Sequence, residues 1–158
     1  MLGQTLTTPA ERRRIRLLGI AAAVLLAEAV WLLAELVFGI RLQAPAGTAY
    51  PEPVDIGPLN VGLASALPSL LGWALLAGLE RLTPRAHRIW LVAALVGLAA
   101  SLATPLAGTG VGTANRMVLV LMHLAVPAVV ISALYRTSPG RRARAAQFAS
   151  AMTQGGAA

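Results

Sequence analysis

The sequence contains no cysteine, no lysine and few charged residues of any kind. Without cysteine, the chain has no disulfide, no thiol redox chemistry and no Cys-ligated zinc, iron–sulfur or haem site. Charged residues make up 12% of the 158 residues, whereas 57% are hydrophobic and the mean hydropathy is +0.71. A soluble domain of this length needs far more charge on its surface. The composition therefore predicts an integral membrane protein.

Enzyme signatures are missing as well. The sequence has no G-x-S-x-G nucleophile elbow and no H-E-x-x-H zinc motif. Its glycine-rich stretch GTGVG, residues 108–112, lacks the lysine that follows the glycines of a phosphate-binding loop. We therefore expect no catalytic residues, no cofactor and no enzymatic activity.

Four apolar runs of about 20 residues are each long enough to cross a bilayer core of about 30 Å. They predict an all-α, integral membrane four-helix bundle over residues 15–135. The expected spans are residues 15–40, 59–79, 89–107 and 117–135. The first run is too long for the apolar part of a signal peptide, so we interpret it as a retained span.

The segments outside the spans have distinct compositions. Residues 1–14 form a basic flank, and residues 136–158 form a basic tail that has too little apolar surface to fold alone. Residues 43–58, QAPAGTAYPEPVDIGP, contain several prolines that forbid a continuous helix, so we expect a loop between the first two helices. Thr8-Pro9-Ala10-Glu11 predicts the start of the first helix, and Thr83-Pro84 predicts the start of the third.

All 13 basic residues are arginine, and most of them lie on one side of the predicted spans. They cluster in residues 12–16, 81–88 and 136–144, whereas the other side has only Arg41 and Arg116. Because arginine near a span favours the cytoplasmic side, we expect a multi-pass protein of the plasma (inner) membrane with both termini in the cytoplasm. The Pro-rich loop would then be extracytoplasmic. We expect the arginine clusters to contact anionic lipid headgroups rather than nucleic acid.

Two glutamates lie inside the first span. Glu28, Trp31 and Glu35 share one helix face through their three- and four-residue spacing. An ionised glutamate at the bilayer centre costs about 3 kcal/mol, so each carboxyl must be neutral, face water or have a partner. Helix rise places Glu35 at the depth of Ser101 and His123. We expect Glu35 to pair with His123 or Arg116, and Glu28 to stay protonated because it has no obvious partner.

This polar set has several interpretations. It can be a hydrogen-bond cluster that stabilises the bundle, a site for a solute, proton or ion, or a contact with another membrane subunit. Metal or haem binding by His123 is not expected, because the other histidine, His87, lies at the opposite side of the bilayer. The four-residue spacing of Ala93, Gly97 and Ser101, and of Ala74 and Gly78, predicts close helix packing, within the chain in preference to between protomers.

The order of these features resembles the DUF6069 family of small actinobacterial membrane proteins. The resemblance covers Ile15 to Leu134 and includes a VWLLAE span, a Pro-rich loop, and the stretches LLAGLERLTPRAHRIW, SLATPLA and MVLVLMHLAV. Its most recognisable residues are Glu80-Arg81, Trp90, Ser101, Pro105-Leu106 and Met122-His123. The resemblance implies a four-span fold and no particular activity.

The sequence therefore predicts a binding or accessory membrane component with a polar pocket in its outer half, acting alone, as a homo-oligomer or with another membrane subunit. The candidate binding residues are Glu28, Trp31, Glu35, Ser101, Arg116 and His123. The alternative is a proton-coupled exporter of small cationic or amphipathic solutes that uses Glu28. Small multidrug-resistance exporters are similar in having four spans and a glutamate in the first, but they lack the Pro-rich loop.

Overall fold

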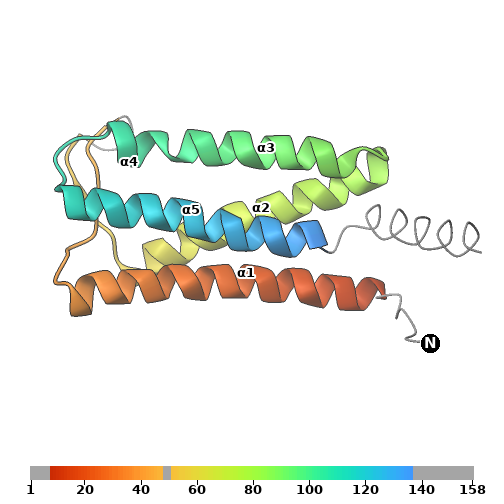
Figure 1. Ribbon diagram of the computed structural model, residues 1–158, viewed down its shortest axis with the longest axis horizontal. Coiled ribbons are helices and arrows are strands. Elements are labelled where there is room, and N and C mark those ends of the chain that lie inside the picture. The colour runs from red at the N-terminus through yellow and green to blue at the C-terminus, as the bar shows by residue number, and fades with distance from the viewer. Residues whose placement is uncertain (1–7, 48–50, 137–158) are drawn as a thin grey trace, which may run out of the picture.

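Four long helices lie side by side in the computed structural model, which describes residues 8–47 and 51–136 (Figure 1). All four are long and apolar enough to cross a membrane, so the prediction of an all-α membrane bundle is confirmed. The predicted disordered tail, residues 136–158, lies outside the described residues except for Arg136, as do residues 1–7 of the basic flank. The helical elements are α1 (Pro9–Leu32) with its π-helical continuation η1 (Leu33–Val37), α2 (Pro58–Leu82), α3 (Ala86–Ser101), α4 (Ala103–Ala107) and α5 (Thr113–Arg136).

The helix starts agree with the sequence in one case and not in the other. The Thr8 side chain accepts a hydrogen bond from the Glu11 amide at 3.2 Å, as expected for an N-cap. The prediction that Thr83 begins the third helix is wrong, because its amide still donates to Leu79 at the end of α2. The chain turns through Pro84 and Arg85 first, and α3 begins at Ala86.

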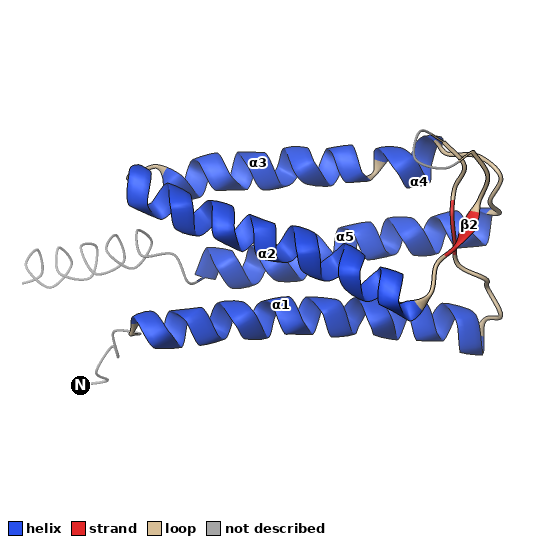
Figure 2. Ribbon diagram, turned by 180° about the vertical axis from the view of Figure 1, so that it is seen from behind, coloured by secondary structure: helices blue, strands red, loops and turns tan. Residues whose placement is uncertain are grey.

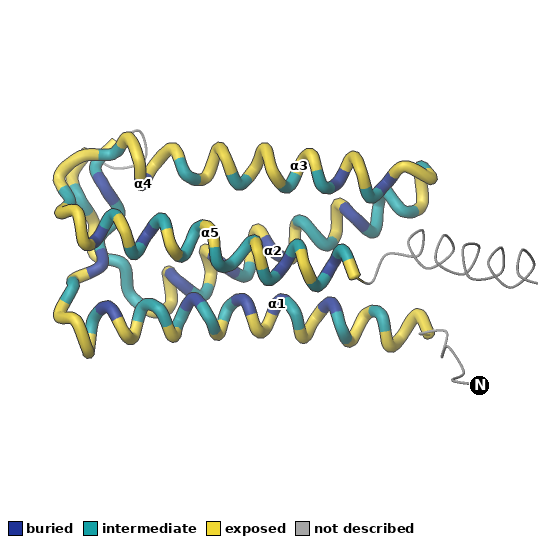
Figure 3. The backbone as a smooth tube through the Cα atoms, in the orientation of Figure 1, coloured by how far each residue is buried: buried dark blue, intermediate teal, exposed yellow. Residues whose placement is uncertain are grey.

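The helix α1 packs on α2 and α5 along one continuous stripe (Figure 3). Its buried residues recur every three or four positions, as helix periodicity requires for a single buried face. They are Arg16, Ile20, Ala23 and Ala27. Gly19 allows α5 to approach closely, since a Cβ atom there would overlap that of Ala133. The two helices are thus in direct contact along much of their length.

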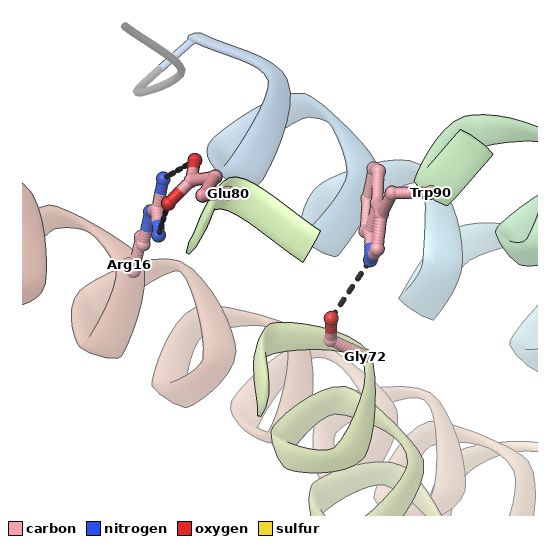
Figure 4. A network of polar contacts seen from close by, with 4 residues as sticks. All are labelled: Arg16, Gly72, Glu80 and Trp90. Atoms are coloured by element: carbon pink, nitrogen blue, oxygen red, sulfur yellow. Dashed lines mark hydrogen bonds and ion pairs between the residues drawn. The ribbon is translucent and has the colours of Figure 1, made fainter. Parts of the chain in front are cut away.

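Two polar contacts made by Arg16 and Trp90 hold helices together in the arginine-rich half of the bundle (Figure 4). The guanidinium of Arg16 forms a bidentate ion pair with Glu80 of α2, with distances of 2.7 and 3.2 Å. The Trp90 indole of α3 donates to the Gly72 carbonyl of α2 at 2.7 Å. The ion pair joins α1 to α2, and the indole hydrogen bond joins α3 to α2.

The opposite end carries a cap, which we define as residues 38–47, 51–57 and 108–112. Gly39, with a positive φ of 62°, ends η1 and reverses the chain. The strands β1 (Gln43–Ala44) and β2 (Val54–Asp55) then pair antiparallel across the end of the bundle (Figure 2).

Two glycines let the two parts of the cap come together. A Cβ atom on Gly108 would collide with Pro45, and one on Gly110 would collide with Pro53. Ala46 and Thr109 exchange two backbone hydrogen bonds of 2.9 and 3.0 Å at the same place. The stretch GTGVG is therefore used for close backbone packing in the cap.

Candidate functional site

A cavity of about 800 Å³ lies between α2, α3 and α5. Its shape follows from the path of α2, which lies beside α3 at their connecting turn and diverges from it toward the cap (Figure 2). One end is lined by Trp90 and Gly72, which are joined by the indole hydrogen bond. Ile56 and Asp55 of the cap line the other end. This volume falls in the range of about 300–1,000 Å³ typical of small-molecule sites.

The wall is mostly aliphatic and open to one side. Leu63 and Leu75 of α2 line the cavity and are also 48% and 47% exposed, and Ala93 and Gly97 of α3 line it and are exposed. The opening therefore lies between α2 and α3, along helices that are apolar enough to face acyl chains.

The small residues of α3 lie on the cavity wall and not in the predicted helix–helix contact. Ala93, Gly97 and Ser101 are all exposed and line the cavity, and a Cβ atom on Gly97 would meet nothing within 4 Å. Close packing within the chain does not occur at these residues, because α3 has diverged from α2 at this depth. The close approach lies instead at Gly19, between α1 and α5.

Two of the six candidate binding residues, Ser101 and His123, line the cavity. The Ser101 hydroxyl donates to the Leu98 carbonyl at 2.8 Å, one turn earlier in α3. The Nδ1 atom of His123 lies 2.7 Å from the Leu119 carbonyl, one turn earlier in α5. Sequence reasoning did not single out Ser69, which lines the same space with Ser65. Its four-residue spacing from Ser65 is the signal that could have found it.

Glu35 lies outside the residues that line the cavity. Its carboxylate accepts a hydrogen bond from the Leu42 amide at 2.8 Å, within the chain reversal that follows η1. The predicted pairing of Glu35 with His123 or Arg116 does not form among residues 8–47 and 51–136. All three side chains bind the backbone instead: Glu35 binds the Leu42 amide, whereas Arg116 and His123 lie within hydrogen-bond distance of backbone carbonyls.

Arg116 also contributes to the cap. Its guanidinium donates to the carbonyl of Leu106 and, at 2.8 Å, to that of Gly108. Leu106 lies in the last turn of α4 and Gly108 directly follows the helix, where the last carbonyls have no helical donors. Arg116 therefore ends α4 rather than neutralising a membrane carboxylate.

Trp31 and Glu28 both face the bundle, but they contact different partners. The Trp31 indole donates to the Ile56 carbonyl in the cap at 2.8 Å. The Glu28 carboxylate lies against Gly62 of α2, where an added Cβ atom would be 3.1 Å from Oε1. In the part of the chain that the structure describes, Glu28 accepts no hydrogen bond.

Sequence reasoning missed one of the residues that fasten the cap to the bundle. Asn115, buried near the start of α5, accepts from the Gln43 amide at 2.8 Å and donates to the Gln43 carbonyl at 2.9 Å. It thus continues the pairing of β1 with a side-chain amide. An asparagine three residues after a glycine-rich loop carries little sequence signal, because such residues are common in turns.

The architecture defines a class: a four-helix, multi-pass membrane protein with a capped, side-opening cavity. The sequence matches the model of DUF6069, described as a family of unknown function, over residues 7–140. The chain therefore belongs to the DUF6069 family. Comparison with curated proteins and with solved structures finds no match.

Proposed function

We propose that this protein binds an apolar or amphipathic small molecule in the cavity between α2, α3 and α5, as a binding or accessory component rather than an enzyme. The observation that carries the proposal is the aliphatic cavity of about 800 Å³ that opens sideways between two membrane-length helices. A ligand dissolved in the bilayer would enter through that opening without crossing the cap.

We further propose that the cap is extracytoplasmic and that both chain ends are cytoplasmic. The start of α1 and the end of α5 lie at the same end of the bundle (Figure 1). That end also carries the arginines of residues 12–16 and 81–88, which favour the cytoplasmic side and contact with anionic headgroups.

The binding proposal is tested by filling the cavity. Gly97→Phe adds a ring where an added Cβ meets nothing within 4 Å, so the variant should fold and occupy the site. Gly78→Phe is the matched control, because Gly78 has equally open surroundings and does not line the cavity. Binding of a fluorescent acyl probe to the purified protein should weaken at least about ten-fold in the first variant only. Equal affinity in both variants would contradict the proposal.

A proton-coupled exporter is the second candidate, favoured by the Glu28 carboxylate, which accepts no hydrogen bond within residues 8–47 and 51–136. A carboxylate without a fixed partner is free to exchange a proton during transport. Binding ranks first because Glu28 lies outside the cavity lining. In proteoliposomes, a pH-gradient-driven flux that Glu28→Gln abolishes would establish the exporter, and a flux that survives the substitution would exclude Glu28 as the carrier.

A further inference from the structure

The serine hydroxyls of the cavity present hydrogen-bond acceptors to a ligand. Ser65 donates to Val61, Ser69 donates to the Ser65 carbonyl at 2.6 Å, and Ser101 donates to Leu98. A hydroxyl has one proton, and in all three residues a carbonyl of the same helix accepts it. Only oxygen lone pairs remain for a molecule in the cavity.

His123 likewise presents a hydrogen-bond acceptor to the cavity. The Leu119 carbonyl can only accept a hydrogen bond, so Nδ1 of His123, 2.7 Å away, carries the proton. In the neutral ring this leaves Nε2 as an acceptor. The indole N–H of Trp90, which also lines the cavity, already donates to Gly72.

The charged and amide groups of the lining lie at its cap end. Asp55 is a further acceptor, and one of its oxygens binds the Gln43 side chain at 2.8 Å. The Asn60 amide, which can donate, is exposed near the start of α2, two residues after Pro58. The membrane-deep part of the cavity is therefore aliphatic, with several acceptors.

Building on the proposed binding function, we propose that the cavity selects a neutral aliphatic molecule with a hydroxyl group, which donates to Nε2 of His123. The aliphatic part would lie along Leu63, Leu75 and Val126. A carboxylate or phosphate offers only acceptors, so it would meet these lone pairs without a donor and lose its hydration. An ether of the same length fits the walls but has no proton to donate.

Three ligands of matched chain test the inference: dodecanol, dodecyl methyl ether and dodecanoate, each competing with the fluorescent acyl probe. One hydrogen bond of ordinary net strength gives the alcohol an advantage of about five-fold over the ether. His123→Phe should remove this advantage. His87→Phe is the control, since His87 does not line the cavity and its ring packs on Tyr135 with centroids 4.3 Å apart. Both variants and the unmodified protein are measured in the same micelles, so ligand partitioning cancels when the alcohol-to-ether affinity ratio is compared between proteins.

The outcomes separate the two proposals. If none of the three ligands displaces the probe and the probe itself does not bind, the proposed function fails. If the ligands bind but the alcohol has no advantage, or dodecanoate binds most tightly, binding stands and the hydroxyl preference is overturned. An advantage that survives His123→Phe would also overturn the assignment of Nε2 as its acceptor.

Discussion

The α1 side and the α3 side of the bundle are built from similar apolar residues, yet they pack very differently. The helix α1 buries residues along most of its length, from Arg16 to Ala27, and η1 adds Ala34. In α3 only Ala86 and Trp90 are buried, both in its first two turns. Beyond Trp90, α2 diverges from α3, and the remainder of α3 forms a wall of the cavity (Figure 2).

This difference shows that the effect of a small residue on helix packing depends on what lies opposite it. Gly19 faces Ala133 at a point where α1 and α5 run side by side, so the absence of a side chain brings two backbones together. Gly97 faces the space left where α2 and α3 diverge, and the same absence enlarges a cavity. Small residues recur every four positions in both helices, at Gly19, Ala23 and Ala27 of α1 and at Ala93, Gly97 and Ser101 of α3. The helix paths therefore decide the result.

The largest expected effect comes from removing the anchor of α3. Trp90 is 2% exposed and joins α3 to α2 through Gly72, so Trp90→Ala should lower the free energy of unfolding by about 3 kcal/mol through lost packing and the lost hydrogen bond. Trp90→Phe keeps most of the packing and should cost about 1 kcal/mol. Thermal unfolding of the purified protein measures both.

The Trp73→Phe variant is the control for the anchor, because Trp73 is only half-buried. If Trp90→Phe cost no more than Trp73→Phe, α3 would be held elsewhere, and the contrast between the two sides of the bundle would disappear.

A smaller effect should separate the two glycines. Gly19→Val places a branched side chain against Ala133 and should destabilise the bundle by about 2 kcal/mol through overpacking. Gly97→Val enters open space and should change stability by less than about 0.5 kcal/mol. The two substitutions are chemically identical, so unfolding measurements compare the sites directly. Equal losses would mean that α3 packs as tightly as α1.

The helices could be predicted from the sequence because membrane crossing imposes a length and a composition that local runs reveal. The N-cap at Thr8 was also predictable from a local pattern, since its partner Glu11 is three residues away. The prediction at Thr83 was wrong because residues 83–85 form a turn between α2 and α3 instead of an N-cap. The pair Arg16–Glu80 spans 64 residues and was missed, although opposite charges at the same end of two neighbouring helices were a usable signal.

The site was less predictable, because depth in the membrane does not determine direction around a helix. Counting rise placed Glu35 level with His123, yet the carboxylate binds the Leu42 amide in the cap while the imidazole faces the cavity. The chain reversal at Gly39 creates that amide partner, and helix counting does not include it. The oblique path of α2, which produces the cavity, is likewise a tertiary property without a local signal.

The smallest expected effect tests this last difference between the cap and the cavity. Glu35→Ala should cost about 1 kcal/mol by leaving the Leu42 amide without its acceptor, and His123→Ala should cost a similar amount or less. The two residues share no partner within residues 8–47 and 51–136, so the losses in the double variant should add to within about 0.5 kcal/mol. Unfolding of the four proteins in one detergent gives the coupling energy. Coupling above about 1 kcal/mol would mean that Glu35 and His123 form one polar cluster, as the sequence predicted, and that the cap and the cavity are a single site.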